Sequence, residues 1–215
     1  MSAPLPQNEK KRLAVLWQYE VLDTMPEELF DDLTELAARI CEAPIALISL
    51  VDEERQWFKS RVGTSITETS REVSFCAYAI RQPGLLIVPD ATRDPRFVSN
   101  PMVVSEPKIR FYAGAPLITP DGHALGTLCV LDKVPRDLRP DQKHALTILA
   151  RHVVSQLELR RRSRDLADVR AQRDELKRKL DALQGKRGKA ANARSANSKL
   201  KPRRSVKIKV KKASR

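Results

Sequence analysis

The stretch Ile45-Ala46-Leu47-Ile48-Ser49-Leu50-Val51 decides the fold, because it is an almost continuous apolar run with branched residues. A run of this length and composition predicts a strand that is buried on both faces. The polar residues 52–55 predict a turn, and residues 56–62 predict a second strand that returns antiparallel to the first. We therefore take this hairpin as the first part of the sheet and place the other elements around it.

Helices and strands alternate with polar loops on both sides of this hairpin. Helical spacing of apolar residues predicts helices over residues 13–22, 27–42, 74–80 and 140 to about 184. Strands are predicted at residues 85–88, 110–117 and 124–132, the last two joined by the turn signature Thr119-Pro120-Asp121-Gly122. Residues 63–72 are predicted as a polar loop. The long irregular segment 89–107, with four prolines, is typical of a lid or pocket loop.

The charge of the chain is concentrated at one end. The 215 residues hold 40 Lys and Arg against 27 Asp and Glu, a formal net charge of +13. Residues 186–215 contain 13 basic residues and no acidic one, so residues 1–185 carry 27 charges of each sign. We expect a neutral folded part, a helix that ends at Gly185 and Gly188, and a disordered basic tail.

Composition also limits the classes of protein to which the chain belongs. It contains no apolar run of 18 residues, and residues 1–12 lack the apolar stretch of a signal sequence, which favours a cytoplasmic location. Cys41, Cys76 and Cys129 are far apart and lie outside any CxxC or Cys/His cluster. Neither a disulfide framework nor a metal site is therefore predicted.

Several motifs, in their order along the chain, resemble the GAF family of bacterial sensory domains over residues 9–160. They are Tyr19 to Thr24, Ile45 to Phe58, Arg71 to Cys76, Val88 to Ala91 with Asp94 to Phe97, and Arg110 to Leu117. The resemblance implies an α+β fold, with a GAF/PAS-like antiparallel sheet of six strands flanked by helices. It also implies a pocket closed by the short helix and the long loop.

The resemblance implies a sensory role as well as a fold. GAF domains bind small molecules or dimerise, and they commonly precede histidine kinase or nucleotide-cyclase domains. No such output domain follows here, so we expect a separate kinase or nucleotide-cyclase partner. The predicted organisation is a flexible N-terminus (1–8), a GAF sensory domain (9–160), an extended helix (161–185) and the disordered basic tail (186–215).

Candidate ligand-binding residues lie on the elements that would enclose the pocket. Aromatic walls would come from Phe75, Tyr78, Phe97, Phe111 and Tyr112, with Cys76 on the short helix and polar groups from Asp90, Arg96, Arg110 and Thr127. The sequence specifies neither the ligand nor a cofactor. In an alternative interpretation, the aromatic residues only fill space and Asp90, Asp94 and Arg96 hold the loop.

Catalysis has weaker support than binding. One GAF subfamily reduces free methionine sulfoxide, which requires an exposed thiolate and a second thiol nearby. The loop from Val98 to Lys108, where the attacking thiol would be expected, has no cysteine, and Cys41 and Cys129 are predicted to be buried packing residues. Cys76 lacks the following histidine of bilin-binding domains, and the cyclic-nucleotide signature Asn-Lys-Phe-Asp-Glu is missing. We therefore predict a non-enzymatic module.

The C-terminal third predicts two kinds of partner. An apolar stripe, broken at Arg173, is typical of a coiled coil and predicts a homodimer; it consists of Leu166, Val169, Leu176, Leu180 and Leu183. The tail predicts sequence-independent nucleic-acid binding, or binding to an anionic membrane, through Lys201, Arg203, Arg204, Lys207, Lys209, Lys211 and Lys212. An alternative function is therefore a nucleic-acid-associated protein whose GAF domain serves dimerisation.

Overall fold

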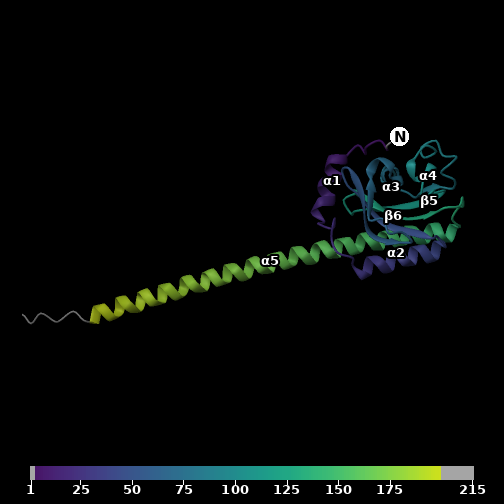
Figure 1. Cartoon of the computed structure of the whole chain (residues 1–215). Coiled ribbons are helices and arrows are strands. Elements are labelled where there is room, and N and C mark those ends of the chain that lie inside the picture. Colours follow the sequence, from purple (N-terminus) through teal and green to yellow (C-terminus); the bar gives the residue numbers. More distant parts are fainter. Residues whose placement is uncertain (1–2, 200–215) are drawn as a thin grey trace, which may run out of the picture. The chain divides into compact units, whose positions relative to one another are not determined.

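The computed structural model describes residues 3–199 (Figure 1). The chain divides into two units, residues 1–163 and residues 164–215, which are described separately. The first unit is built on a six-stranded antiparallel sheet in the order β3-β2-β1-β6-β5-β4. Its strands are β1 (Ile45–Val51), β2 (Arg55–Val62), β3 (Glu68–Ser70), β4 (Leu86–Val88), β5 (Phe111–Ile118) and β6 (Ala124–Asp132). The predicted α+β fold with an antiparallel sheet is confirmed.

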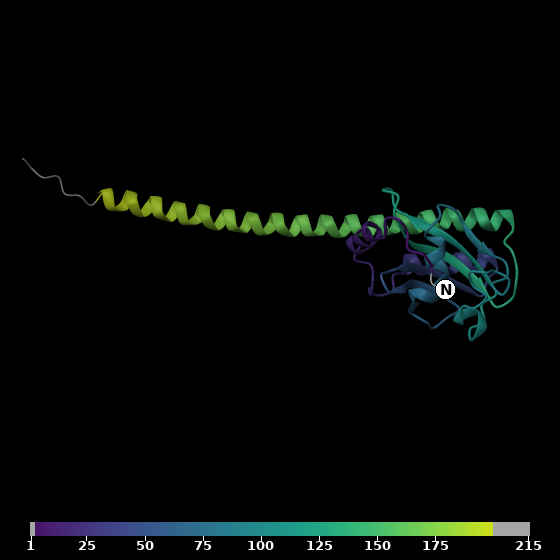
Figure 2. The same cartoon turned by 90° about the horizontal axis from the view of Figure 1, so that it is seen from above.

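Helices cover both faces of this sheet. The α-helices are α1 (Glu9–Gln18), α2 (Glu28–Cys41), α3 (Phe75–Ala79), α4 (Pro101–Val104) and α5 (Pro140–Lys199), and a 3₁₀ helix spans Arg71–Val73. Within the first unit, α2 and the start of α5 lie on one face, and α3 and α4 lie on the other (Figures 1 and 2). Among the described residues, no helix combines the length and apolar content needed to cross a bilayer.

Alternation along β1 explains why the sheet has two cores. Successive side chains of a strand point to opposite faces, so an apolar run supplies both. Ile48 packs with α2 and with the α5 residues Leu146 and Leu149, whereas Leu47 packs with Phe75 of α3. All seven residues of β1 are buried, as the sequence predicts.

Several predicted boundaries differ from the structure. The helix predicted over residues 13–22 is α1, which spans Glu9–Gln18, and the irregular segment 89–107 contains the short helix α4. Residues 63–72 contain the short strand β3, whose three residues pair with Arg55, Gln56 and Trp57 of β2. Helix α5 does not end at Gly185 and Gly188 but continues to Lys199. Each glycine costs a helix only about 1 kcal/mol relative to alanine, and the surrounding Lys, Arg and Ala are good helix formers. The predicted nucleic-acid-binding residues, from Lys201 to Lys212, lie outside the described residues.

Candidate functional site: a cavity under helix α3

A cavity of about 330 Å³ lies on the α3 face of the sheet. Cavities that bind small molecules commonly begin near this size. Its apolar and aromatic walls come from Ile45, Leu47, Phe58, Ile66, Val73, Phe75, Met102, Pro107, Ile109, Tyr112 and Leu131. The other lining residues are polar side chains, two cysteines and a glycine: Gln56, Gly63, Thr64, Ser65, Thr69, Cys76, Cys129 and Lys133. The lining is thus mainly apolar, with a few polar groups.

The floor of the cavity follows from strand alternation. Ile45 and Leu47 of β1 are two residues apart, as are Cys129 and Leu131 of β6, so each pair shares one face of the sheet. Antiparallel pairing places Leu47 opposite Cys129, which brings the two pairs side by side. Neighbouring strands therefore form a continuous apolar floor.

Stacked aromatic rings support the α3 side of the cavity. The ring of Phe75 stacks on Phe97 with the centroids 4.1 Å apart, and on Tyr112 with the centroids 5.2 Å apart. The rings of Tyr78 and Phe97 pack edge to face, with the centroids 4.9 Å apart. Because Phe97 and Tyr112 are completely buried, these contacts fix the position of α3 over the sheet.

Gln56 joins β2 to the start of α3. Its Oε1 accepts hydrogen bonds from Ser74 Oγ at 2.5 Å and Ser49 Oγ at 3.3 Å. Its Nε2 donates to Thr69 Oγ1 at 2.6 Å. Ser74 Oγ in turn accepts from the backbone N–H of Ala77 and caps α3. The side-chain amide of Gln56 is therefore hydrogen-bonded both to strands of the sheet and to the residue that caps α3.

Two cysteines and a tyrosine meet in the cavity wall. The Sγ atoms of Cys76 and Cys129 are 3.8 Å apart, and the Tyr112 hydroxyl donates to Cys76 Sγ at 3.5 Å. Burial acts to raise the pKa of Cys76, but hydrogen bonds donated by its neighbours, Cys129 first among them, outweigh it and lower the pKa. Burial and the adjacent Cys76 raise the pKa of Cys129. The pKa values of the two thiols are therefore shifted in opposite directions.

Gly114 makes room for the Tyr112 hydroxyl. A Cβ atom at Gly114 would lie 2.1 Å from the Tyr112 oxygen, so the ring lies along the strand over a position that has no side chain. We expect Gly114→Ala to lower the free energy of unfolding by about 1–3 kcal/mol through overpacking. Chemical denaturation measures this loss. Gly84→Ala, whose Cβ would meet no atom within 4 Å, serves as the control, and equal losses in both variants would contradict the steric explanation.

The structure places the predicted ligand-binding residues in several environments. Phe75, Cys76 and Tyr112 line the cavity. Phe97 and Tyr78 contact this aromatic wall from outside the cavity lining. Phe111 lies in the core on the opposite face, because strand alternation separates it from its neighbour Tyr112.

The four predicted polar residues lie outside the cavity lining. Asp90 accepts from the backbone and side chain of Thr92, and Arg96 pairs with Asp94 at 2.5 Å. Arg110 donates to the carbonyl groups of Val103 and Ile109, so these three side chains hold the long loop. Thr127 is completely buried in β6, two residues before Cys129 on the same face.

The family model named GAF domain matches residues 25–157, more than half of the chain. The chain belongs to the GAF family. It is 49% identical to a cyclic di-GMP phosphodiesterase of Pseudomonas aeruginosa over 133 residues. The matched region covers 62% of this chain and 23% of that protein. The GAF chain therefore spans less than a quarter of this relative's length.

Solved GAF domains share the fold at low sequence identity. The GAF domain of an Acinetobacter phosphoenolpyruvate-protein phosphotransferase gives a TM-score of 0.52 at 17% identity, covering 72% of this chain and 95% of that chain. The GAF domain of the Coxiella burnetii phosphoenolpyruvate-protein phosphotransferase gives a TM-score of 0.51 at 17% identity, with coverages of 73% and 96%. These likenesses show the fold alone.

Sequence reasoning missed several lining residues of the GAF cavity. Gln56 and Phe58 alternate along β2 and face the cavity together, a signal that strand periodicity contains. Ile66 and Thr69 lie in the segment predicted as a plain polar loop. Their position depends on the pairing of β3 with β2, which only the folded chain reveals.

Proposed function

We propose that this chain is a non-enzymatic, cytoplasmic GAF sensory module that binds a small planar or amphipathic molecule and dimerises to regulate a separate output partner. The observation that carries this proposal is the cavity of about 330 Å³ with mainly apolar walls. Apolar walls with a few polar groups suit a small organic ligand. The 49% identity to part of a cyclic di-GMP phosphodiesterase supports an output partner that degrades a signalling nucleotide.

The sheet gives a ligand a physical route to α5. Leu47 lines the cavity, and its neighbour Ile48 packs on the opposite face, in the core that includes Val153 and Leu157 of α5. A ligand that displaces β1 must therefore disturb the packing of α5, because close-packed cores transmit strain.

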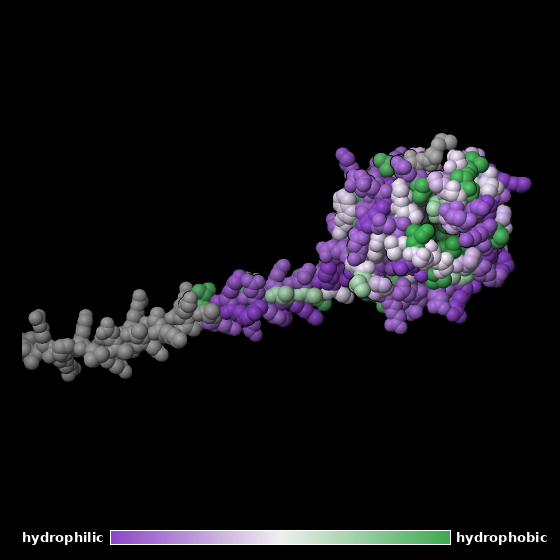
Figure 3. Space-filling model, viewed as in Figure 1, coloured by the Kyte–Doolittle hydropathy of each residue, from purple (hydrophilic) through white to green (hydrophobic). Residues whose placement is uncertain are grey.

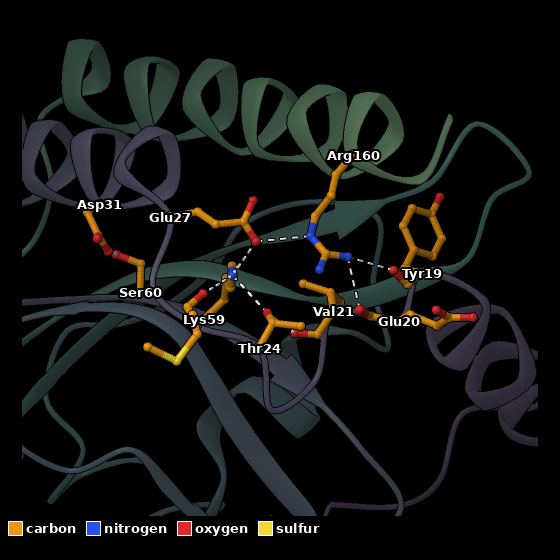
Figure 4. A network of polar contacts seen from close by, with 10 residues as sticks. Tyr19, Glu20, Val21, Thr24, Glu27, Asp31, Lys59, Ser60 and Arg160 are labelled. Atoms are coloured by element: carbon orange, nitrogen blue, oxygen red, sulfur yellow. Dashed lines mark hydrogen bonds and ion pairs between the residues drawn. The ribbon is translucent and has the colours of Figure 1, made fainter. Parts of the chain in front are cut away.

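A polar network also fixes α5 to the sheet (Figure 4). The Arg160 guanidinium of α5 donates to Glu27 at 3.0 Å and to the carbonyl groups of Tyr19 and Glu20 at 3.1 and 2.9 Å. Glu27 also pairs with the buried Lys59 of β2 at 2.7 Å. Movement of β2 therefore reaches α5 through two charged contacts.

The second unit offers a surface for dimerisation. In a heptad register, Leu166 and Leu180 take a positions, and Val169, Leu176 and Leu183 take d positions, all of them at least 50% exposed. Much of the part of the second unit that carries colour in Figure 3 is hydrophilic. A partner helix would bury these side chains, each worth about 1.5–3 kcal/mol.

Charges on the same helix favour a parallel arrangement. Arg173 takes the remaining a position, and one polar residue at a selects register and oligomeric state at a cost in stability. In a parallel pair, Asp165 at g faces Arg170 at e of the partner helix, an attractive contact. An antiparallel pair would bring together e positions that carry Arg170 and Lys177, which repel each other.

Filling the cavity tests ligand binding. Ile66 lines the cavity and is 39% exposed, so Ile66→Trp adds side-chain volume at the cavity without replacing a fully buried residue. We expect the wild-type chain to show a thermal shift with at least one compound of a broad metabolite panel. The same compound should give no shift with Ile66→Trp, and native mass spectrometry should show the same loss of bound mass.

The matched control is Leu29→Trp on the exposed side of α2, where Leu29 is 59% exposed and outside the cavity lining. This variant should keep the ligand shift of the wild type. The absence of any shift or bound mass in the wild-type chain would contradict ligand binding, as would an undiminished shift in Ile66→Trp.

A further inference from the structure

The structure brings together two of the three cysteines, which lie 53 residues apart in the sequence. Cys76 lies on α3 and Cys129 on β6, their Sγ atoms are 3.8 Å apart, and both line the cavity. Cys41 is equally buried but lies in the core on the opposite face, with α2. Cys129 is completely buried, as the sequence predicts, but it also contacts a second thiol, which the sequence does not predict.

Hydrogen bonds give the two sulfur atoms different roles. Cys76 Sγ accepts from the Tyr112 hydroxyl, whose ring is placed by the missing side chain at Gly114. Cys129 Sγ donates to the Leu47 carbonyl at 3.7 Å. Cys76 therefore accepts a hydrogen bond that favours its thiolate, whereas Cys129 has an acceptor that favours its thiol.

We propose that Cys76 and Cys129 are a redox pair, which a small hydroperoxide entering the cavity oxidises reversibly to a disulfide. The geometry that supports this is the contact of the two sulfur atoms in the cavity lining, where 3% of the surface of Cys76 is exposed. The inference goes beyond ligand sensing and depends on neither the ligand nor the dimer.

The reaction takes place in two steps. The Cys76 thiolate, whose proton has gone to solvent, attacks one oxygen of the hydroperoxide and the O–O bond breaks. Cys76 becomes a sulfenic acid, and the leaving oxygen takes up a proton from solvent to form water or an alcohol. The Cys129 sulfur then attacks the Cys76 sulfur, the S–S bond forms, and the S–O bond breaks. The hydroxide leaves as water with the Cys129 proton. The two thiols lose two electrons in total, and the hydroperoxide gains them.

Oxidation changes the shape of the cavity. A disulfide has an S–S distance of about 2.05 Å, so the sulfur atoms must approach by about 1.8 Å from their separation of 3.8 Å. Cys76 is on α3 and Cys129 is on the sheet, so the bond draws the wall of the cavity towards its floor. The reduced and oxidised chains therefore present different cavities.

Oxidation of the full wild-type chain by hydrogen peroxide tests the proposal without any substitution. After treatment with a stoichiometric amount of peroxide, denaturation and alkylation, we expect one of the three cysteines to accept the alkylating reagent. The intact mass should fall by two hydrogen atoms before alkylation, and peptide mapping should find a Cys76–Cys129 cross-link. Dithiothreitol should restore all three thiols. Oxidation that yields only sulfinic acid, or a cross-link to Cys41, would overturn the proposal.

Cys41 is an internal control for reactivity. Burial raises its pKa to about 11, although Arg136 close by opposes the rise. At pH 7.5 we expect Cys76 to lose its thiol at least about tenfold faster than Cys41, because the thiolate is the reactive form. The ionisable groups that face Cys76 are Cys129 of β6 and Tyr112 of β5, and the hydrogen bond from Tyr112 favours its thiolate. Equal rates for Cys76 and Cys41 would contradict the proposed roles.

Single variants separate the two steps. Cys129→Ser removes the resolving thiol, so the sulfenic acid at Cys76 should persist and react with dimedone. Cys76→Ser should slow oxidation of Cys129 at least about tenfold, because burial, the largest cause of its raised pKa, remains in the variant. Cys41→Ser should form the cross-link at the wild-type rate. A Cys129→Ser chain that oxidises without a dimedone adduct at Cys76 would exclude the sulfenic acid step.

Discussion

Replacement of Leu176 by aspartate is expected to convert the proposed dimer into a monomer at tens of micromolar. Leu176 is 66% exposed in the single chain and takes a central d position of the stripe. A dimer would bury two copies, and their loss removes about 3–6 kcal/mol. Each 1.4 kcal/mol is a factor of ten in Kd, so the dimer should weaken at least about a hundredfold. Sedimentation velocity over a concentration series measures the change.

The matched control is Ala171→Asp, which introduces the same charge on the same helix outside the a and d positions. This variant should sediment as the wild-type chain does. Neither substitution should alter thermal unfolding of residues 1–163, because both lie in the second unit. A wild-type chain that is monomeric at tens of micromolar would refute the dimer, and so would a Leu176→Asp chain that remains dimeric.

Local sequence patterns predict the sheet because its strands have clear periodicity. The run from Ile45 to Val51 forms β1 at its predicted boundaries, and β2 follows as the antiparallel partner. The same periodicity separates Phe111 from Tyr112, since adjacent strand residues face opposite sides. Assignment of both aromatic residues to one pocket disregarded this rule, which was available from the sequence.

Other features depend on contacts that local patterns do not contain. The segment that holds β3 has neither a long apolar run nor alternation, so its pairing with β2 becomes visible only in the folded sheet. The meeting of Cys76 and Cys129 requires α3 to pack over β6, and no spacing in the sequence encodes that contact. Short elements and long-range side-chain contacts are therefore the parts of the site that the sequence does not predict.

A second large effect is expected from Glu27→Ala, because this carboxylate neutralises a completely buried ammonium group. The side chain of Lys59 has no exposed surface, and its Nζ donates to Glu27 at 2.7 Å, Thr24 Oγ1 at 2.9 Å and the Met25 carbonyl at 2.8 Å. Without Glu27, the Lys59 ammonium group keeps only the two neutral acceptors. Breaking a buried ion pair costs about 3–5 kcal/mol. Since Glu27 is 39% exposed and solvent screens it, we expect about 2–3 kcal/mol.

A loss of this size should lower the Tm by about 5–10 °C, which differential scanning calorimetry measures. Glu28→Ala, an exposed neighbour in the first turn of α2, should cost less than about 1 kcal/mol, the usual size of a helix-dipole effect. Equal losses in the two variants would show that the carboxylate acts on the helix rather than on Lys59.

The pH dependence distinguishes the ion pair from simple loss of packing. Burial acts to raise the pKa of Glu27, but hydrogen bonds from Lys59 and Arg160 outweigh it, and the pKa is lowered from its ordinary value of 4.5. Because the pKa of Glu27 is lower in the folded state, its ionised form stabilises the protein at pH values above 4.5. This stabilisation is lost as the pH falls through the folded-state pKa. The stability difference between wild type and Glu27→Ala should therefore be constant between pH 6 and 8 and shrink below about pH 4.5. A difference that persists unchanged at pH 3 would mean that the carboxylate contributes packing and no charge, and the buried Lys59 would then need another counter-charge.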